Sequence, residues 1–233
     1  MHDNMPAFRH LPSAALAFTC FLSISGAGAA EWTGGVEGGS VMRDGESSTR
    51  LRAHASLNSR PLSHDVHAEW YRNDANSIEL GYKPRYWLDE KLYTFGEGRL
   101  RFEEDLGIDR ETQLLAGLGL QVLATRDQQL LLEAGAGYRF TTFTDETLLD
   151  DASEGVGVLR AAGSQVLSDL FKLDLIADVF ASASYVQSQA EVGVSVRVPQ
   201  GAIRLSYRTR RVDIDDLDAV TDSDTAVGFT IGF

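Results

Sequence analysis

Cysteine is nearly absent from this chain. The 233 residues contain one, Cys20, which lies close to the amino terminus. If that segment is removed on export, the mature protein has no thiol, which excludes disulfide bonds and thiolate metal sites. A chain without cysteine also suits passage through an oxidising compartment in the unfolded state. The alternative is a lipoprotein acylated at Cys20, but Thr19 stands where a small residue is usual.

Long apolar runs are missing after residue 30. No later stretch approaches the roughly twenty consecutive apolar residues that a membrane helix requires. The earlier stretch Leu11 to Ile24 is apolar, follows Arg9 and precedes Gly26 to Ala30, which supply the small residues that signal peptidase needs. We therefore predict a signal peptide over residues 1–30 and one mature domain over residues 31–233.

Basic residues are too few for a nucleic-acid partner. Lys and Arg number 21 against 34 Asp and Glu, which gives a formal net charge of -13 and a pI near 4.7. Phosphate binding requires basic surfaces, so nucleic acid is excluded as a partner. The classes that remain for an exported chain without a membrane helix are a periplasmic protein, a secreted protein and an outer-membrane barrel.

The sequence has alternating polarity instead, most plainly at its end. Val227, Phe229, Ile231 and Phe233 alternate with small or polar residues, so they share one face of a strand. Such a strand suits a barrel wall between lipid and lumen. It is also similar to the terminal signal by which outer-membrane proteins reach their insertion machinery. We therefore predict an assembly signal at Phe229, Ile231 and Phe233, against the alternative of an ordinary half-buried strand.

Alternation recurs throughout the mature chain, whereas helical periodicity is scarce. Charges oppose the apolar face of nearly every segment, which is rare in a soluble sandwich. We predict an all-β fold, an antiparallel transmembrane β-barrel of the bacterial outer membrane with twelve strands, ten or fourteen being the alternatives. The expected strands are residues 32–42, 48–59, 64–73, 77–87, 92–104, 111–123, 129–143, 154–166, 171–184, 188–198, 201–212 and 225–233.

The connections between these strands fall into two sets. Every second one is short, as at Pro199-Gln200, whereas the others include Asp105 to Arg110, Thr144 to Ser153 and Asp213 to Asp224, which are longer and acidic. Outer-membrane barrels have short periplasmic turns and long external loops. The acidic loops are expected to share divalent cations with lipopolysaccharide, one of the expected partners beside outer-membrane lipids. They lack a dedicated calcium motif, so no metal site is predicted.

Three glycine-rich motifs carry a family resemblance. They are Tyr93 to Asp105, Leu115 to Leu120 and Leu132 to Arg139. They resemble the salt-induced outer-membrane proteins catalogued as domain of unknown function 481, and the resemblance covers most of the mature chain. The first hairpin departs from the family pattern, because it reads Arg-Asp-Gly-Glu-Ser-Ser over residues 43–48. The resemblance implies an outer-membrane barrel and brings no catalytic residues.

One cluster of residues is a candidate for chemistry. If residues 48–59 and 64–73 form a hairpin, Ser56 lies near Asp65 and His54 near His67. A Ser/His/acid site or a two-histidine metal site could form there. The alternative is a polar lumen in which these groups pair with one another, as Arg52 would with Glu69. We favour that alternative because the cluster lies near the periplasmic turn.

Charges of both signs are expected to line the lumen, where buried charges must be paired. Arg204, Arg208 and Arg210 could instead form a basic ladder for anions. The predicted function is a non-enzymatic barrel of the cell envelope, either a narrow channel or a structural, salt-stress barrel, without a cofactor. The alternative is an outer-membrane lipid hydrolase. The expected lining residues are Arg52, Glu69, Glu97, Arg99, Arg101, Glu133, Arg139, Arg204 and Arg208.

Overall fold

The computed structural model describes residues 31–43, 46–72, 76–103, 108–144, 152–183, 185–214 and 219–232. The chain divides into two units, Met1–Ala30 and Glu31–Phe233. All described residues belong to the second unit. The predicted signal peptide and Phe233 lie outside the described residues.

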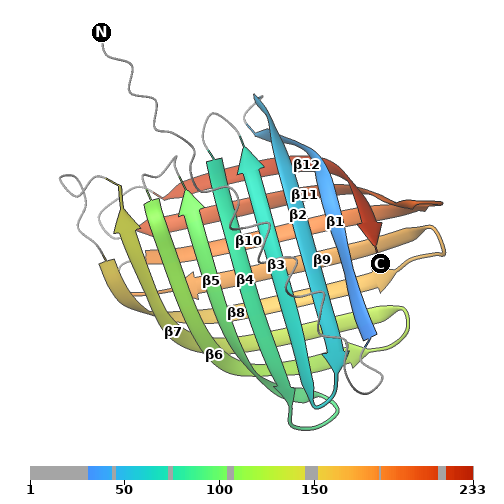
Figure 1. Cartoon of the computed structure of the whole chain (residues 1–233), viewed down its shortest axis with the longest axis horizontal. Coiled ribbons are helices and arrows are strands. Elements are labelled where there is room, and N and C mark those ends of the chain that lie inside the picture. The colour runs from blue at the N-terminus through green and yellow to red at the C-terminus, as the bar shows by residue number, and fades with distance from the viewer. Residues whose placement is uncertain are drawn as a thin grey trace. The chain divides into compact units, whose positions relative to one another are not determined.

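Twelve antiparallel strands form a closed barrel (Figure 1). Each strand pairs with its neighbour in sequence, and β1 pairs with β12 to close the wall. The strands in front, β1 to β5, cross those behind, β9 to β12, as strand tilt in a barrel requires. The predicted twelve-stranded all-β barrel is confirmed. Its strands are β1 (Glu31–Arg43), β2 (Glu46–Ser59), β3 (Leu62–Arg72), β4 (Asn76–Trp87), β5 (Leu92–Glu103), β6 (Ile108–Ala124), β7 (Gln128–Phe143), β8 (Ala152–Val166), β9 (Phe171–Ala181), β10 (Tyr185–Val198), β11 (Gly201–Ile214) and β12 (Val220–Gly232).

The predicted acidic loop at residues 213–224 is largely wrong. β11 continues to Ile214 and β12 already begins at Val220, so Asp222 and Asp224 lie within a strand. Asp224 is buried and forms an ion pair of 2.9 Å with Arg208 on the neighbouring strand. Polar composition suggested a solvated loop, but a carboxylate facing a charged lumen is compatible with a strand. The aspartates at residues 215, 216 and 218 lie outside the described residues.

β9 ends earlier than predicted. It stops at Ala181 rather than at residue 184, because a tight turn follows. The Ser182 hydroxyl accepts a hydrogen bond of 3.2 Å from the backbone N–H of Tyr185. The backbone N–H of Ser182 donates to the carbonyl oxygen of Tyr185 at 2.9 Å. This connection is short, as the expected strand bounds implied, although it belongs to the set that includes the longer loops.

The two faces of the wall have opposite polarity. On β12 the side chains of Val227 and Ile231 are 53% and 57% exposed, whereas Asp224 and Ala226 on the other face are 4% and 3% exposed. The aromatic side chains of Tyr82, Tyr86, Tyr138 and Phe140 also lie exposed on the outside. An apolar exterior around a charged interior reverses the pattern of a soluble protein and matches a wall in contact with lipid. Among the described residues no helix is long and apolar enough to cross a membrane.

Glycines on β6 and β7 make room for two aromatic rings from β5. Tyr93 is fully buried, and its ring lies where a Cβ on Gly119 would stand. The ring of Phe95 lies in the same way against Gly117 and, at 3.1 Å from the ideal Cβ position, against Gly135. Glycine lets the backbone bend at a barrel corner and lets a ring pack directly onto it. These contacts fill the part of the lumen beside β5 to β7.

Side chains cap three of the turns at one end of the barrel. The Asp89 carboxylate accepts hydrogen bonds of 2.7 Å from the backbone N–H groups of Leu92 and Lys91. These two donors, Leu92 first, hold the pKa of this exposed carboxyl below its usual range. Ser168 and Thr125 cap their own turns in a similar way. Short turns join β2–β3, β4–β5, β6–β7, β8–β9 and β10–β11.

Candidate functional site in the barrel lumen

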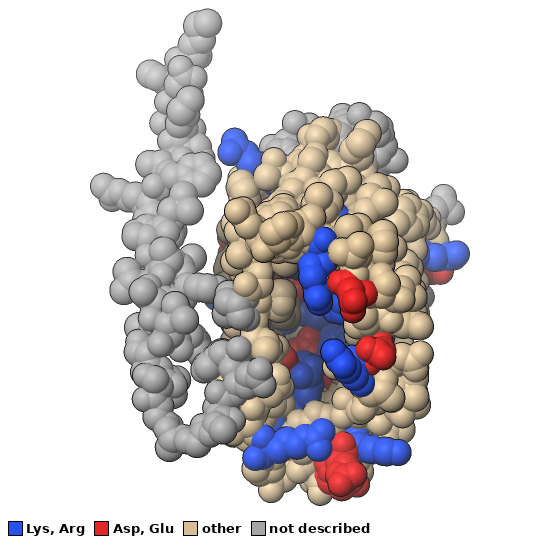
Figure 2. Space-filling view, turned by 90° about the vertical axis from the view of Figure 1, so that its right-hand side faces the viewer, with Lys and Arg blue, Asp and Glu red and all other residues tan. Residues whose placement is uncertain are grey.

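Charged side chains fill the lumen, as Figure 2 shows for one mouth of the barrel, where blue and red groups lie inside a mostly uncharged wall. Alternation places them there, because the residues between the exposed apolar positions of each strand point inward. Most of the ion pairs among them form two separate clusters. Each cluster joins strands that are not neighbours in the wall.

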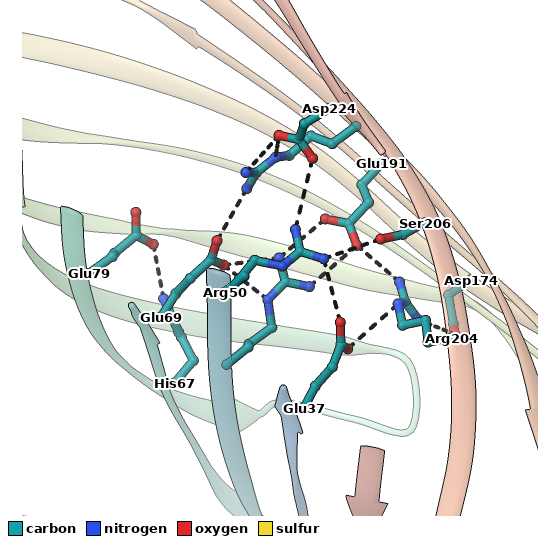
Figure 3. Close-up of polar contacts among 12 residues, drawn as sticks. Glu37, Arg50, His67, Glu69, Glu79, Asp174, Glu191, Arg204, Ser206 and Asp224 are labelled. Atoms are coloured by element: carbon teal, nitrogen blue, oxygen red, sulfur yellow. Dashed lines mark hydrogen bonds and ion pairs between the residues drawn. The ribbon is translucent and has the colours of Figure 1, made fainter. Parts of the chain in front are cut away.

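The first cluster spans the junction between β1 and β12, and we call it the seam cluster (Figure 3). Arg52 of β2 contacts Glu69 at 2.9 Å and reaches Glu191 of β10 at 3.3 Å. Glu191 also accepts a hydrogen bond of 3.0 Å from Arg204. Arg50 lies between Glu37 and Asp224, as Figure 3 shows. The seam cluster comprises Glu37, Arg50, Arg52, Glu69, Asp174, Glu191, Arg204, Arg208 and Asp224.

The second cluster lies beside β4 to β9, and we call it the wall cluster. Arg160 of β8 binds Glu97 of β5 at 2.8 Å, Glu133 at 3.1 Å and Asp178 at 2.6 Å. Glu133 also pairs with Lys83 and accepts a hydrogen bond of 2.8 Å from the Tyr93 hydroxyl. The wall cluster comprises Asp65, Glu79, Lys83, Arg85, Glu97, Arg99, Glu133, Arg160 and Asp178.

The pairing within the clusters has a physical cause. Glu97, Glu133 and Glu191 are almost inaccessible to solvent. A carboxylate in such a place is costly unless opposite charges and hydrogen bonds replace its water. Each of the three carboxylates contacts at least two cations. Ion pairs therefore cross-link the lumen at both clusters, beside the part that the Tyr93 and Phe95 rings fill.

Two of the cavities in the described part of the barrel lie between and beside the clusters. The large cavity has a volume of about 350 Å³ and lies toward the ends of β3, β5 and β11, with Tyr71, Glu103 and Arg210 in its lining. The small cavity has a volume of about 290 Å³ and lies toward the turn between β2 and β3, where Ser56 and Asp65 line it. The two cavities share a wall formed by His54, His67, Arg99, Ile176 and Asp178.

The hairpin of β2 and β3 has the register expected from the sequence. Ser56 is opposite Asp65, His54 opposite His67 and Arg52 opposite Glu69. The Ser56 hydroxyl donates a hydrogen bond of 2.6 Å to Asp65.

This pairing does not form a catalytic triad. Asp65 also pairs with Arg85, and His67 contacts Glu79 at 3.2 Å. Among the described residues neither His54 nor His67 hydrogen-bonds to Ser56, so neither histidine is placed as its base. Within the same residues no group of three or more His, Cys, Asp or Glu side chains is arranged to hold a metal ion.

The structure places the lining residues predicted from sequence in the lumen, and each makes an ion pair. The predicted basic ladder does not offer free charges at Arg204 and Arg208, because carboxylates pair with both side chains. Arg160 was missed because Val156 and Val158 give β8 apolar residues on its inner face, so that polarity did not reveal the face. Glu37 and Arg50 were missed although a signal was present. Arg50 lies two positions before Arg52 on β2, and Glu37 lies opposite Arg52 in the register of β1 and β2.

The closed twelve-stranded barrel has a fold similar to that of outer-membrane porins and channels. The chain belongs to the family described as "Protein of unknown function, DUF481", whose model matches residues 37–233. The NanC porin is similar in fold, with 10% identity, a TM-score of 0.58 and coverage of 84% of this chain and 98% of that one. An outer-membrane channel from Pseudomonas putida F1 gives 9% identity, a TM-score of 0.50 and coverage of 89% and 97%. At such identities the likeness concerns the fold alone. No curated protein matches the sequence.

Proposed function

We propose that this protein is a non-enzymatic barrel of the outer membrane that acts as a narrow channel for small polar or charged solutes. The observation that carries the proposal is the pair of charge-lined cavities in the lumen, which share one wall. Polar cavities in series form a path for hydrated solutes, whereas the apolar outer face fits lipid.

The ion pairs across the lumen define how narrow the channel is. Arg52 and Glu191 join β2 to β10, and Arg160 and Glu97 join β8 to β5, so large solutes are excluded from these parts of the cross-section. Solutes pass between the clusters, along the shared wall at Ile176. Such a pore has a small conductance, because few ions fit side by side.

Planar bilayers containing the purified, refolded protein test this proposal. We expect discrete current steps of small amplitude. Ile176→Ala removes bulk from the shared wall and should raise the amplitude. Val179→Ala on the same strand is the matched control, since Val179 points outward and is exposed. A bilayer without steps at any voltage, or equal amplitudes for both variants, contradicts the proposal.

A structural barrel linked to salt stress is the second candidate. The same cross-lumen pairs favour it, because they would hold a closed barrel together without any conduction. Under this candidate the bilayer remains silent, and deletion of the protein sensitises cells to salt or detergent. Transcript abundance before and after a salt shock tests the stress link separately.

A further inference from the structure

Two charges in the large cavity differ from all the others. Its lining contains many ionisable side chains, and within the part of the chain that the structure describes, each of the other Arg, Asp and Glu groups has an ion pair. Arg101 pairs with Glu103, and Arg139 pairs with Glu111 at 3.6 Å. Arg210 and Asp222 are the exceptions, since neither lies at ion-pair distance from an opposite charge of a described residue.

Arg210 is directed toward a neutral partner. Its Nη2 donates a hydrogen bond of 3.2 Å to the side-chain oxygen of Gln187 on β10. Its Nε is buried and has no acceptor among the described residues. Its Nη1 is accessible and also makes no hydrogen bond to a described residue. The guanidinium therefore offers one donor edge to the cavity. A planar fork of this kind recognises carboxylates with two parallel hydrogen bonds.

Asp222 stands directly opposite Arg210 in the register of β11 and β12. Residues opposite each other in an antiparallel pair have Cβ atoms roughly 4.5–5.5 Å apart. The next pair along these strands, Arg208 with Asp224, has the same residue types and forms an ion pair of 2.9 Å. The pair Arg210–Asp222 is open because Arg210 turns to Gln187. A positive and a negative group thus lie side by side, each available to a ligand.

We propose that Arg210 and Asp222 bind a small zwitterionic solute, with its carboxylate on Arg210 and its ammonium group on Asp222. A simple anion would be repelled by Asp222 and a simple cation by Arg210, whereas a zwitterion satisfies both. The cavity of about 350 Å³ holds a solute of amino-acid size together with water, since one water molecule occupies about 30 Å³ in the liquid. The inference rests on the proposed channel and names the class of solute that the channel favours.

Swelling of liposomes that contain the refolded protein tests the inference. L-Alanine is the zwitterionic probe, and lactamide is a neutral probe of nearly the same size. We expect L-alanine to enter at least three times faster than lactamide through the wild-type protein. Arg210→Gln and Asp222→Asn should each bring the two rates to within about 1.5-fold of each other. Arg211→Gln is the matched control, because Arg211 adjoins the site in sequence but is 60% exposed on the opposite face.

Direct binding separates this inference from the channel itself. Saturation-transfer NMR with L-alanine on the detergent-solubilised barrel should give a signal that both site variants lose and Arg211→Gln keeps. If lactamide and L-alanine both fail to enter liposomes while this NMR signal is present, the channel is refuted and the site stands. If lactamide enters but L-alanine has no advantage and no NMR signal, the site is refuted and the channel stands. If Arg210→Gln loses the L-alanine advantage and Asp222→Asn keeps it, the proposed zwitterion site is refuted, because this result would indicate an anion site.

Discussion

Arg52 on β2 forms an ion pair of 3.3 Å with Glu191 on β10, although four steps around the wall separate these strands. The shorter route passes over β1, β12 and β11, so the contact spans the junction at which the first and last strands meet. That junction pairs Gly35 with Gly232 and Gly39 with Gly228, which have no side chains to pack. The seam cluster therefore supplies contacts where the wall itself has few.

Removing the charge of Glu191 should weaken the barrel at this junction. Glu191→Gln leaves Arg52 and Arg204 each with one carboxylate fewer in a buried place. We expect the free energy of unfolding to fall by about 1–3 kcal/mol. Urea unfolding in micelles, followed by tryptophan fluorescence, measures the change.

The control for this prediction is an exposed ion pair. Arg211 and Asp213 lie 3.5 Å apart, and both are more than half exposed. Asp213→Asn should change the free energy of unfolding by no more than about 1 kcal/mol. Equal effects of Glu191→Gln and Asp213→Asn would show that the seam cluster does not stabilise the closure.

The two clusters should act independently. No ion pair between described residues links the seam cluster to the wall cluster, in which Glu133 holds Lys83 and Arg160. Glu133→Gln combined with Glu191→Gln should therefore lower the free energy of unfolding by the sum of the single effects, to within about 0.5 kcal/mol. The same urea titrations on the three variants decide this. A coupling well above that limit would mean that the lumen is one network.

The glycines beneath the β5 rings give a steric prediction. A Cβ on Gly117 would collide with the carbonyl oxygen of Ala134 and with the Phe95 ring, whereas a Cβ on Gly155 would meet no atom within 4 Å. Gly117→Ala should destabilise the barrel by about 1–3 kcal/mol through overpacking. Gly155→Ala is the matched control and should be neutral or slightly stabilising. Thermal shift of the heat-modifiable band on gels ranks the two, and a tolerated Gly117→Ala would refute the packing described for Phe95.

Alternation was enough to predict the barrel, its strand number and the register of the hairpin that contains Ser56 and Asp65. Alternation failed where apolar residues point into the lumen or where acidic residues lie within a strand. Val156 and Val158 point inward, so β8 gave no sign of Arg160, and the aspartates at 222 and 224 suggested a loop although they lie in β12. The pair of Arg52 with Glu69 within one hairpin was predicted, but the ion pairs across the lumen were not. Contacts such as that of Lys83 with Glu133 join β4 to β7, and no local pattern determines which residues meet across a lumen.

Ser56 gives a prediction about catalysis. Its hydroxyl donates to Asp65, which keeps Arg85 as a partner when the hydroxyl is removed. Ser56→Ala should therefore change the free energy of unfolding by about 1 kcal/mol or less. We expect no ester or phospholipid hydrolysis by the purified wild-type protein, measured with a chromogenic ester and with phospholipid vesicles. Hydrolysis by the wild type that is lost in Ser56→Ala would instead favour the lipid hydrolase.

The orientation of the barrel in the membrane can be tested with single cysteines, since Cys20 lies within the predicted signal peptide. Gln200 lies in the turn between β10 and β11, and Ala219 directly precedes β12 at the opposite end of the barrel; both are exposed. Because short turns face the periplasm in outer-membrane barrels, a membrane-impermeant maleimide should label Ala219→Cys in intact cells. Gln200→Cys should react only after the outer membrane is permeabilised. Protease treatment of intact cells should abolish the labelling of Ala219→Cys, which would confirm that this residue is exposed on the cell surface. The opposite pattern would invert the barrel and place the large cavity, with Arg210 and Asp222, on the periplasmic side.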